Sequence, residues 1–134
     1  MGKSLIQTAN QSVQTVAENS IINLGSTQRR FGCNLHLSGN GIEVNGEGYY
    51  VIDANVTVAP AAAGTVTVAL YNNGAQIPGA IASGYVATAE NPVNLSVIST
   101  VRQGCCCDSA DNITCVLVTG AGDVQNISLR VVKE

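Results

Sequence analysis

Apolar and polar residues alternate along most of this chain, and this period of two limits what the chain can fold into. In a β-strand successive side chains point to opposite faces, so the alternation is typical of strands that are buried on one face. The clearest example runs over residues 48–60, where one face would carry Tyr50, Ile52, Ala54, Val56 and Val58. Because apolar residues almost nowhere recur at helical spacing, the sequence predicts an all-β protein.

Further strands are expected where the alternation returns. The clear segments are residues 65–71, 92–101, 112–119 and 126–133, and the weaker ones are 12–16, 21–24, 30–37 and 42–44. Turn residues such as Asn72-Asn73-Gly74 separate them. Residues 79–89 are small and poorly patterned, which indicates either a connection or a weak edge strand. About eight to ten short strands without helices between them favour a sandwich or barrel of antiparallel strands.

Composition excludes several classes of function. The chain has 134 residues, which is enough for one domain, and only 11% of them are charged. With a net charge of −3 and only Arg29 and Arg30 clustered among the cations, it lacks the basic surface that nucleic acid binding requires. No apolar run approaches the roughly 18 residues that span a membrane. The first twenty residues contain no apolar segment typical of a signal peptide, so none is expected.

Four segments carry a resemblance to a known family. They are Gly48-Tyr49-Tyr50-Val51-Ile52, Val68-Ala69-Leu70-Tyr71-Asn72-Asn73-Gly74, Asp111-Asn112-Ile113-Thr114-Cys115-Val116-Leu117 and Ile127-Ser128-Leu129-Arg130-Val131-Val132. In order they resemble the glycine-aromatic strand, the next strand and turn, the Gly-Asp strand and the closing strand of one fold. That fold is the trimeric jelly roll shared by complement collagen-head domains and tumour necrosis factor. The chain departs from the family in having Ala110 where Gly is frequent, and in having few aromatic residues.

The resemblance implies a jelly-roll sandwich of eight to ten antiparallel strands over residues 13–134. Residues 1–12 are then expected to form an N-terminal arm or attachment segment. A narrower likeness lies in Leu24-Gly25-Ser26-Thr27-Gln28-Arg29-Arg30-Phe31-Gly32-Cys33. This segment is similar to small virion proteins of phages and prophages of gut Firmicutes.

The resemblance also implies a homotrimer. In the family, the sheet that holds the glycine-aromatic, Gly-Asp and closing strands packs around the three-fold axis, so its outer face is expected to be apolar. The predicted trimer interface consists of Tyr49, Val51, Val116, Val118 and Val132. The segments 65–71 and 92–101 are expected in the solvent-facing sheet, with Ile98 as an exception to their polar outer faces. The alternative is that the five are isolated surface side chains.

Five cysteines invite a search for disulfides or a metal site. Cys105, Cys106 and Cys107 are consecutive, so adjacent side chains point apart, and the Cys-x-x-Cys spacing of zinc sites is absent. A disulfide between Cys33 and one of the three is the preferred pairing. Fully reduced thiols, or a thiol cluster shared by three copies, are the alternatives. The alternation places Cys115 in the core as a small apolar side chain.

Nothing in the sequence indicates catalysis or a cofactor. The one histidine, His36, lies between Leu35 and Leu37 in a strand pattern, which favours a surface position. The nine carboxylates are dispersed, so no adjacent pair is placed for acid–base chemistry. The sequence therefore predicts a protein that is not an enzyme.

Two functions fit these observations. The first is a virion structural protein, a phage head fibre or capsid decoration protein located on the virion, with a capsid or other virion protein as partner. The second is a carbohydrate- or cell-surface-binding module of a phage fibre or of a bacterial or spore surface. In the second, the loops over residues 38–48 and 72–79 would bind a surface glycan. The absence of Trp weakens this version, because sugars commonly stack on aromatic rings.

Overall fold

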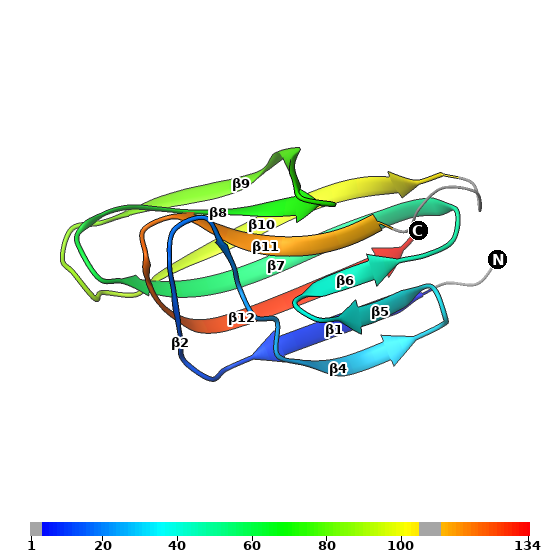
Figure 1. The fold of residues 1–134 in the computed structure, drawn as a ribbon, viewed down its shortest axis with the longest axis horizontal. Helices are drawn as coiled ribbons and strands as arrows, with labels where there is room; N and C mark the ends of the chain where they lie inside the picture. Colours follow the sequence, from blue (N-terminus) through cyan, green and yellow to red (C-terminus); the bar gives the residue numbers. More distant parts are fainter. Residues whose placement is uncertain (1–3, 105–110) are drawn as a thin grey trace.

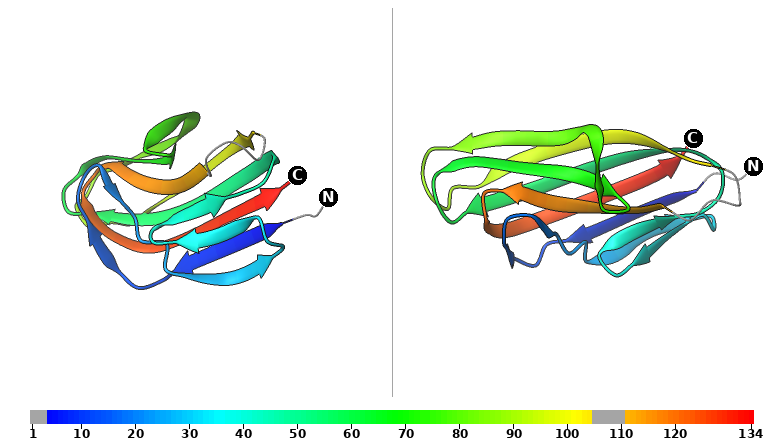
Figure 2. Two further views of the ribbon diagram at one scale, coloured as in Figure 1. Left: turned by 45° about the vertical axis from the view of Figure 1, so that its right-hand side comes forward. Right: turned by 45° about the horizontal axis from the view of Figure 1, so that its top comes forward.

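The chain folds into two antiparallel β-sheets that pack face to face. The computed structural model describes residues 4–104 and 111–134. Figure 1 shows the two layers, and the rotated views in Figure 2 show that both sheets twist along their length. The predicted fold class is confirmed: the chain is an all-β jelly-roll sandwich. Within the described residues, no helix has the length and apolar character needed to cross a membrane.

Sheet A contains both ends of the chain. Its strand order is β10-β7-β12-β1-β4, and the short β2 pairs with β12. The bounds of its strands are β1 (Leu5–Asn10), β2 (Gln14–Val16), β4 (Ser26–Phe31), β7 (Gly48–Pro60), β10 (Val93–Gln103) and β12 (Gly122–Lys133). Because β12 lies between β1 and β7, the first and last strands are neighbours in the middle of this sheet.

Sheet B packs against sheet A and is built from the remaining strands of the chain. Its order is β5-β6-β11-β8-β9, and the short β3 pairs with β11. The bounds of its strands are β3 (Ser20–Ile21), β5 (Leu35–Ser38), β6 (Gly41–Val44), β8 (Gly64–Asn72), β9 (Ala75–Val86) and β11 (Asp111–Thr119). From β9 onward every connection crosses from one sheet to the other, so most strand pairs join segments that are far apart in sequence.

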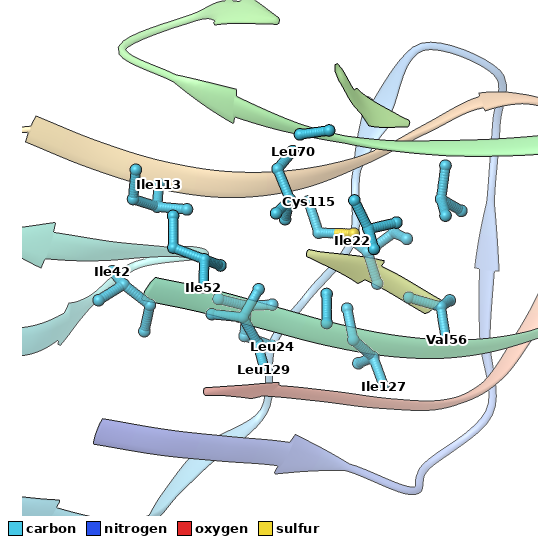
Figure 3. Packing of buried hydrophobic residues seen from close by; sticks show 14 of the residues in the cluster. Ile22, Leu24, Ile42, Ile52, Val56, Leu70, Ile113, Cys115, Ile127 and Leu129 are labelled. Carbon is cyan, nitrogen blue, oxygen red and sulfur yellow. The ribbon is translucent and has the colours of Figure 1, made fainter. Parts of the chain in front are cut away.

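The core lies between the sheets and is almost entirely aliphatic. Figure 3 shows Ile52, Ile127 and Leu129 of sheet A facing Leu70 and Ile113 of sheet B. All five side chains are fully buried. The predicted inward face of β7 is also confirmed, since its alternate residues from position 50 to position 58 are buried. The period of two therefore identified the core face of this strand correctly.

Tyr50 is the one large aromatic side chain that is fully buried. Its hydroxyl lies 2.9 Å from the backbone oxygens of both Asn45 and Gly46, which share its one donated proton. Because these bonds satisfy the polar end of the ring, the rest of the side chain is buried without an unpaired hydroxyl. The turn between β6 and β7 is thereby fixed to the start of β7.

The described residues form twelve strands, more than the eight to ten expected. One reason is that the weak segment 30–37 contains the end of β4 and most of β5, which are separated by residues 32–34. A second reason is that β1 lies in the segment that was expected to form an arm. The poorly patterned residues 79–89 largely belong to β9, a strand of 12 residues at the edge of sheet B.

The N-terminal segment differs from the expectation. Residues 1–12 were expected to form an arm, but β1 lies between β12 and β4 inside sheet A. Ile6 and Thr8 are fully buried, and the Thr8 hydroxyl donates to the backbone oxygen of Leu129 at 3.5 Å. Because a threonine takes the second inward position, the strand has only one strong apolar signal, and the expectation of an arm over residues 5–10 is wrong.

The expected division of strands between the sheets is also wrong in two places. β11, the Gly-Asp strand, lies in sheet B and pairs with β8 and β6, so it does not share a sheet with β7 and β12. β10, expected in the solvent-facing sheet, pairs with β7 over its whole length. Alternation identifies which face of a strand is buried, but it does not identify the neighbouring strand.

The position of β1 leads to a stability prediction. Ile6→Ala removes a fully buried side chain from the middle of sheet A, so we expect the free energy of unfolding to fall by about 2 to 5 kcal/mol. Gln7→Ala, on the opposite face of the same strand, should lower it by less than about 1 kcal/mol. Urea denaturation at one fixed protein concentration measures both. Equal, small effects of the two changes would show that β1 is not part of the folded sheet.

Candidate functional site

The outer face of sheet A carries an apolar row that crosses four neighbouring strands. Residues paired directly across antiparallel strands point to the same face of a sheet. The register pairs Phe31 with Leu5, Leu5 with Val132, and Val132 with Val51. We call Phe31, Leu5, Val132 and Val51 the apolar row. Phe31 is 65% exposed, and the other three are half-buried.

Two further apolar side chains lie beside this row on the same face. Tyr49 precedes the row on β7 and is 55% exposed, and Ile98 on β10 is 65% exposed. The guanidinium of Arg102 lies 5.9 Å from the centroid of the Tyr49 ring and 4.0 Å from the carboxylate of Glu47. The exposed apolar surface therefore includes side chains from five of the six strands of sheet A, at the end where β12 finishes (Figure 1).

The next row along the strands is charged. The register aligns Arg29, Gln7, Arg130 and Asp53 across β4, β1, β12 and β7, and Ile98 of β10 completes this row. Arg130 donates a hydrogen bond from Nη2 to Oδ2 of Asp53 at 3.1 Å, and both side chains are about half exposed. We call Arg29, Gln7, Arg130 and Asp53 the charged row.

The next two rows on this face are polar and uncharged. Two further rows contain Ser128, Asn55 and Ser96, and then Asn126, Thr57 and Asn94. Asn94 donates to the Thr57 hydroxyl at 3.0 Å. A shallow hollow of about 350 Å³ lies where these rows meet the charged row. The face therefore changes from apolar through charged to neutral polar along the strand direction.

The five predicted interface residues do not form one surface. Tyr49, Val51 and Val132 lie together on the outer face of sheet A. Val116 and Val118 belong to β11 of sheet B, on the opposite side of the sandwich. Their assignment to the same face is wrong, because it depended on placing β11 beside β7 and β12.

Sequence reasoning missed three apolar residues of sheet A's outer face. Leu5 lies in the segment taken as an arm, and Phe31 is the last residue of β4. The sequence identifies Ile98 only as an exception to the polar outer face of a strand that is expected in the other sheet. The alternation predicts that the Ile98 side chain points outward. This is the one sequence feature that indicates the patch, since an exposed isoleucine in a polar strand face indicates a neighbouring apolar surface.

On sheet B, Val116 belongs to a shorter apolar row. It is paired with Ile21 of β3 and with Ala69 of β8, and Ala69 is paired with Ile81 of β9. Val116 and Ala69 are already buried within the single chain, at 6% and 0% exposure. This row therefore leaves little apolar surface except at Ile21 and Ile81.

The cysteine predictions are tested only in part. Cys33 is exposed in the turn between β4 and β5. Cys105, Cys106 and Cys107 lie outside the described residues, so the expected pairing with Cys33 and the thiol cluster stay predictions. Cys115 is fully buried, which confirms its predicted core position (Figure 3). Burial raises the pKa of its thiol from 9.0 to about 12.

His36 has the predicted exposed position on β5. The Arg30 guanidinium donates from Nη2 toward Nδ1 of this ring at 2.9 Å, and from Nε to the backbone oxygen of Leu35 at 2.8 Å. Arg30 thus connects β4 of sheet A to β5 of sheet B at the open edge of the sandwich. Among residues 4–104 and 111–134, no three His, Cys, Asp or Glu side chains gather as metal ligands do.

The loops predicted for a glycan ligand lie near each other. The loop before β7 and the hairpin between β8 and β9 flank the start of β11, where Asn73 accepts a hydrogen bond from the backbone of Asn112 at 2.9 Å. A shallow hollow of about 320 Å³ beside the hairpin is lined by Ile77, Pro78 and Val101 among others. None of its lining residues is aromatic, so it offers no ring for a sugar to stack on.

These features define a class of protein by its fold: a jelly-roll sandwich whose sheet A contains the first and last strands. No family model matches the chain, and no curated protein matches it. Solved structures do match over nearly the whole length. Murine APRIL is similar with a TM-score of 0.78 and 13% identity, over 99% of this chain and 100% of that chain. The globular domain of zebrafish complement 1qA has a TM-score of 0.71 and 5% identity, over 96% and 94%.

A vertex protein has a similar fold. PRD1 vertex protein P5 is similar with a TM-score of 0.61 and 12% identity, over 98% of this chain and 72% of that chain. At these identities the comparisons establish a common fold of the tumour-necrosis-factor and complement 1q type. The jelly roll expected from the four sequence segments is therefore confirmed.

The burial of Cys115 predicts a pH dependence. Its pKa is higher in the folded protein than in the unfolded chain, so folding favours the protonated thiol. The corresponding stability is fully present below pH 9 and is lost as the pH rises from 9 toward 12. Urea denaturation at pH 7 and pH 10 should show this loss.

Cys115→Ala is the control for this experiment, because it removes the titrating thiol. We expect the fall in unfolding free energy between pH 7 and pH 10 to be smaller in this variant than in the original protein. An identical fall in both proteins would show that the Cys115 thiol does not titrate at a raised pKa.

Proposed function

We propose that the chain is a non-enzymatic homotrimer that serves as a structural part of a virion, of the head-fibre or capsid-decoration type. The observation that supports it most directly is the apolar row on the outer face of sheet A. The opposite face of sheet A packs against the core. At one end the sheet is therefore apolar on both faces. A sheet of this kind is normally covered on both faces.

Another copy of the chain supplies the simplest cover. The apolar row and Tyr49 form an apolar patch rather than scattered single residues, and Ile98 lies diagonally across from Val51 at its border. Depletion of charge and enrichment of aromatic side chains are typical of the centre of an interface. Phe31 and Tyr49 have this character, and they are largely exposed in the single chain.

The number three follows from the resemblance to the trimeric jelly roll of complement collagen-head domains and tumour necrosis factor. A cyclic trimer is a closed assembly, in which one side of the interface patch contacts the other side of the neighbour's patch. The apolar row crosses β4, β1, β12 and β7, so a single row supplies both sides of such a contact.

The virion role is supported by two likenesses. PRD1 vertex protein P5 has a similar fold over 98% of this chain. The segment from Leu24 to Cys33 resembles small phage virion proteins. Location on the virion, with a capsid or other virion protein as partner, is part of the proposal.

A matched pair of substitutions tests the oligomer. Ile98→Asp introduces a charge on the outer face of sheet A, and Ile81→Asp does the same on an edge strand of sheet B. Analytical ultracentrifugation should give three times the chain mass of 13.7 kDa for the original protein and for Ile81→Asp. Ile98→Asp should dissociate to single chains. Equal behaviour of the two variants would contradict an interface on sheet A.

The virion role has a separate test. Purified virus particles from the host that carries the gene are probed with antibody against the chain, and a glycan array is probed with the purified protein. Labelled particles without glycan binding are expected. Sub-millimolar binding to a defined sugar, with unlabelled particles, would instead support the carbohydrate- or cell-surface-binding module.

A further inference from the structure

We propose that Arg29 of one subunit binds Asp53 of the neighbouring subunit, forming a ring of three such pairs beside the apolar row. This inference rests on the proposed trimer and adds the contact that fixes how the subunits are rotated against each other. It is carried by the charged row, in which Arg29 and Asp53 stand at the same level but on distant strands.

The proposal places the three-fold axis of the trimer along the strands, so that each row keeps its level in all three subunits. A three-fold axis along the strands rotates each row into its copies without moving it up or down. The apolar row closes into one ring under this rotation, whereas an axis across the strands would separate its copies. The charged row lies two residues further along the strands, about 7 Å from the apolar row. Three copies of it therefore form the layer next to the apolar ring.

Within one chain, Arg29 is too far from Asp53 to bind it. Arg29 is on β4 and Asp53 is on β7, which are three strand spacings apart in sheet A. This separation is about 14 Å at the usual spacing of neighbouring strands. Among residues 4–104 and 111–134, the guanidinium of Arg29 makes only a long hydrogen bond, at 3.4 Å, to the backbone oxygen of Gln28 next to it. A carboxylate for Arg29 in this layer has to come from another subunit.

Asp53 has room for a second guanidinium. Arg130 donates to its Oδ2, and an ionised carboxylate accepts about four hydrogen bonds through its two oxygens. Asp53 is the one carboxylate in the charged row, and its side chain is 45% exposed in the single chain. It is therefore the acceptor at this level that remains accessible to an approaching subunit.

The positions of the two residues suit a cyclic contact. Arg29 stands on β4, which is one edge of sheet A, and Asp53 stands on β7, next to the opposite edge strand β10. In a closed ring, one side of each subunit meets the other side of the next subunit. The β4 side of one subunit then lies against the β7–β10 side of its neighbour. Arg29 and Asp53 are placed on the two sides that meet.

A double-mutant cycle tests the pair. The variants are Arg29→Gln, Asp53→Asn and the double variant, and sedimentation equilibrium measures the dissociation of the trimer. We expect Arg29→Gln to weaken association at least tenfold in the original protein. In the Asp53→Asn background it should weaken association less than threefold, because its partner is already lost. Arg30→Gln is the matched control, since Arg30 is adjacent but engaged with β5, and it should leave association unchanged.

The outcomes separate this inference from the proposed function. A trimer that tolerates Arg29→Gln, or that is weakened equally by it in both backgrounds, would overturn the Arg29–Asp53 pair and leave the trimer standing. Single chains at all concentrations for the original protein would overturn both. Loss of association with Arg30→Gln to the same extent as with Arg29→Gln would show a general charge effect, and it too would overturn the pair.

Discussion

The pairing of β12 with β1 on one side and with β7 on the other holds sheet A together. These contacts join the last strand to the first strand and to the middle of the chain. Loop closure over such separations is costly in entropy, so the pairs must be supported by burial of the inward side chains. Ile6, Ile52 and Leu129 supply that burial from the three strands. The outer face of sheet A exists only because this pairing brings the three strands into one register.

The same register gives the outer face its layered chemistry. Because side chains alternate between faces, each strand contributes its outward residues at fixed levels. Leu5, Val132 and Val51 meet at one level, and Arg130 meets Asp53 at the next. In the proposed trimer the apolar layer would provide association, and the charged layer beside it would provide orientation, since unpaired or displaced charges penalise other arrangements. The proposed trimer and the proposed pair of Arg29 with Asp53 are two consequences of one strand alignment.

The sequence predicted local features well and long-range ones poorly. Alternation located the inward face of β7 and the buried position of Cys115, because both depend only on the phase within one strand. It missed β1, whose inward positions include Thr8, and it did not show that β10 rather than β11 lies beside β7. Strand partners depend on the three-dimensional path of the chain. For this reason Tyr49, Val51 and Val132 share the outer face of sheet A, whereas the two predicted residues of β11 lie in sheet B.

The central claim is that the outer face of sheet A is covered in solution while that of sheet B is not. Two tyrosines of equal chemical reactivity report on the two faces: Tyr49, 55% exposed on sheet A, and Tyr85, 72% exposed on sheet B. Hydroxyl-radical footprinting with peptide mass spectrometry measures how fast each ring is modified. The account predicts that Tyr49 is modified several times more slowly than Tyr85. Modification of both rings in proportion to their exposure in the single chain would contradict it.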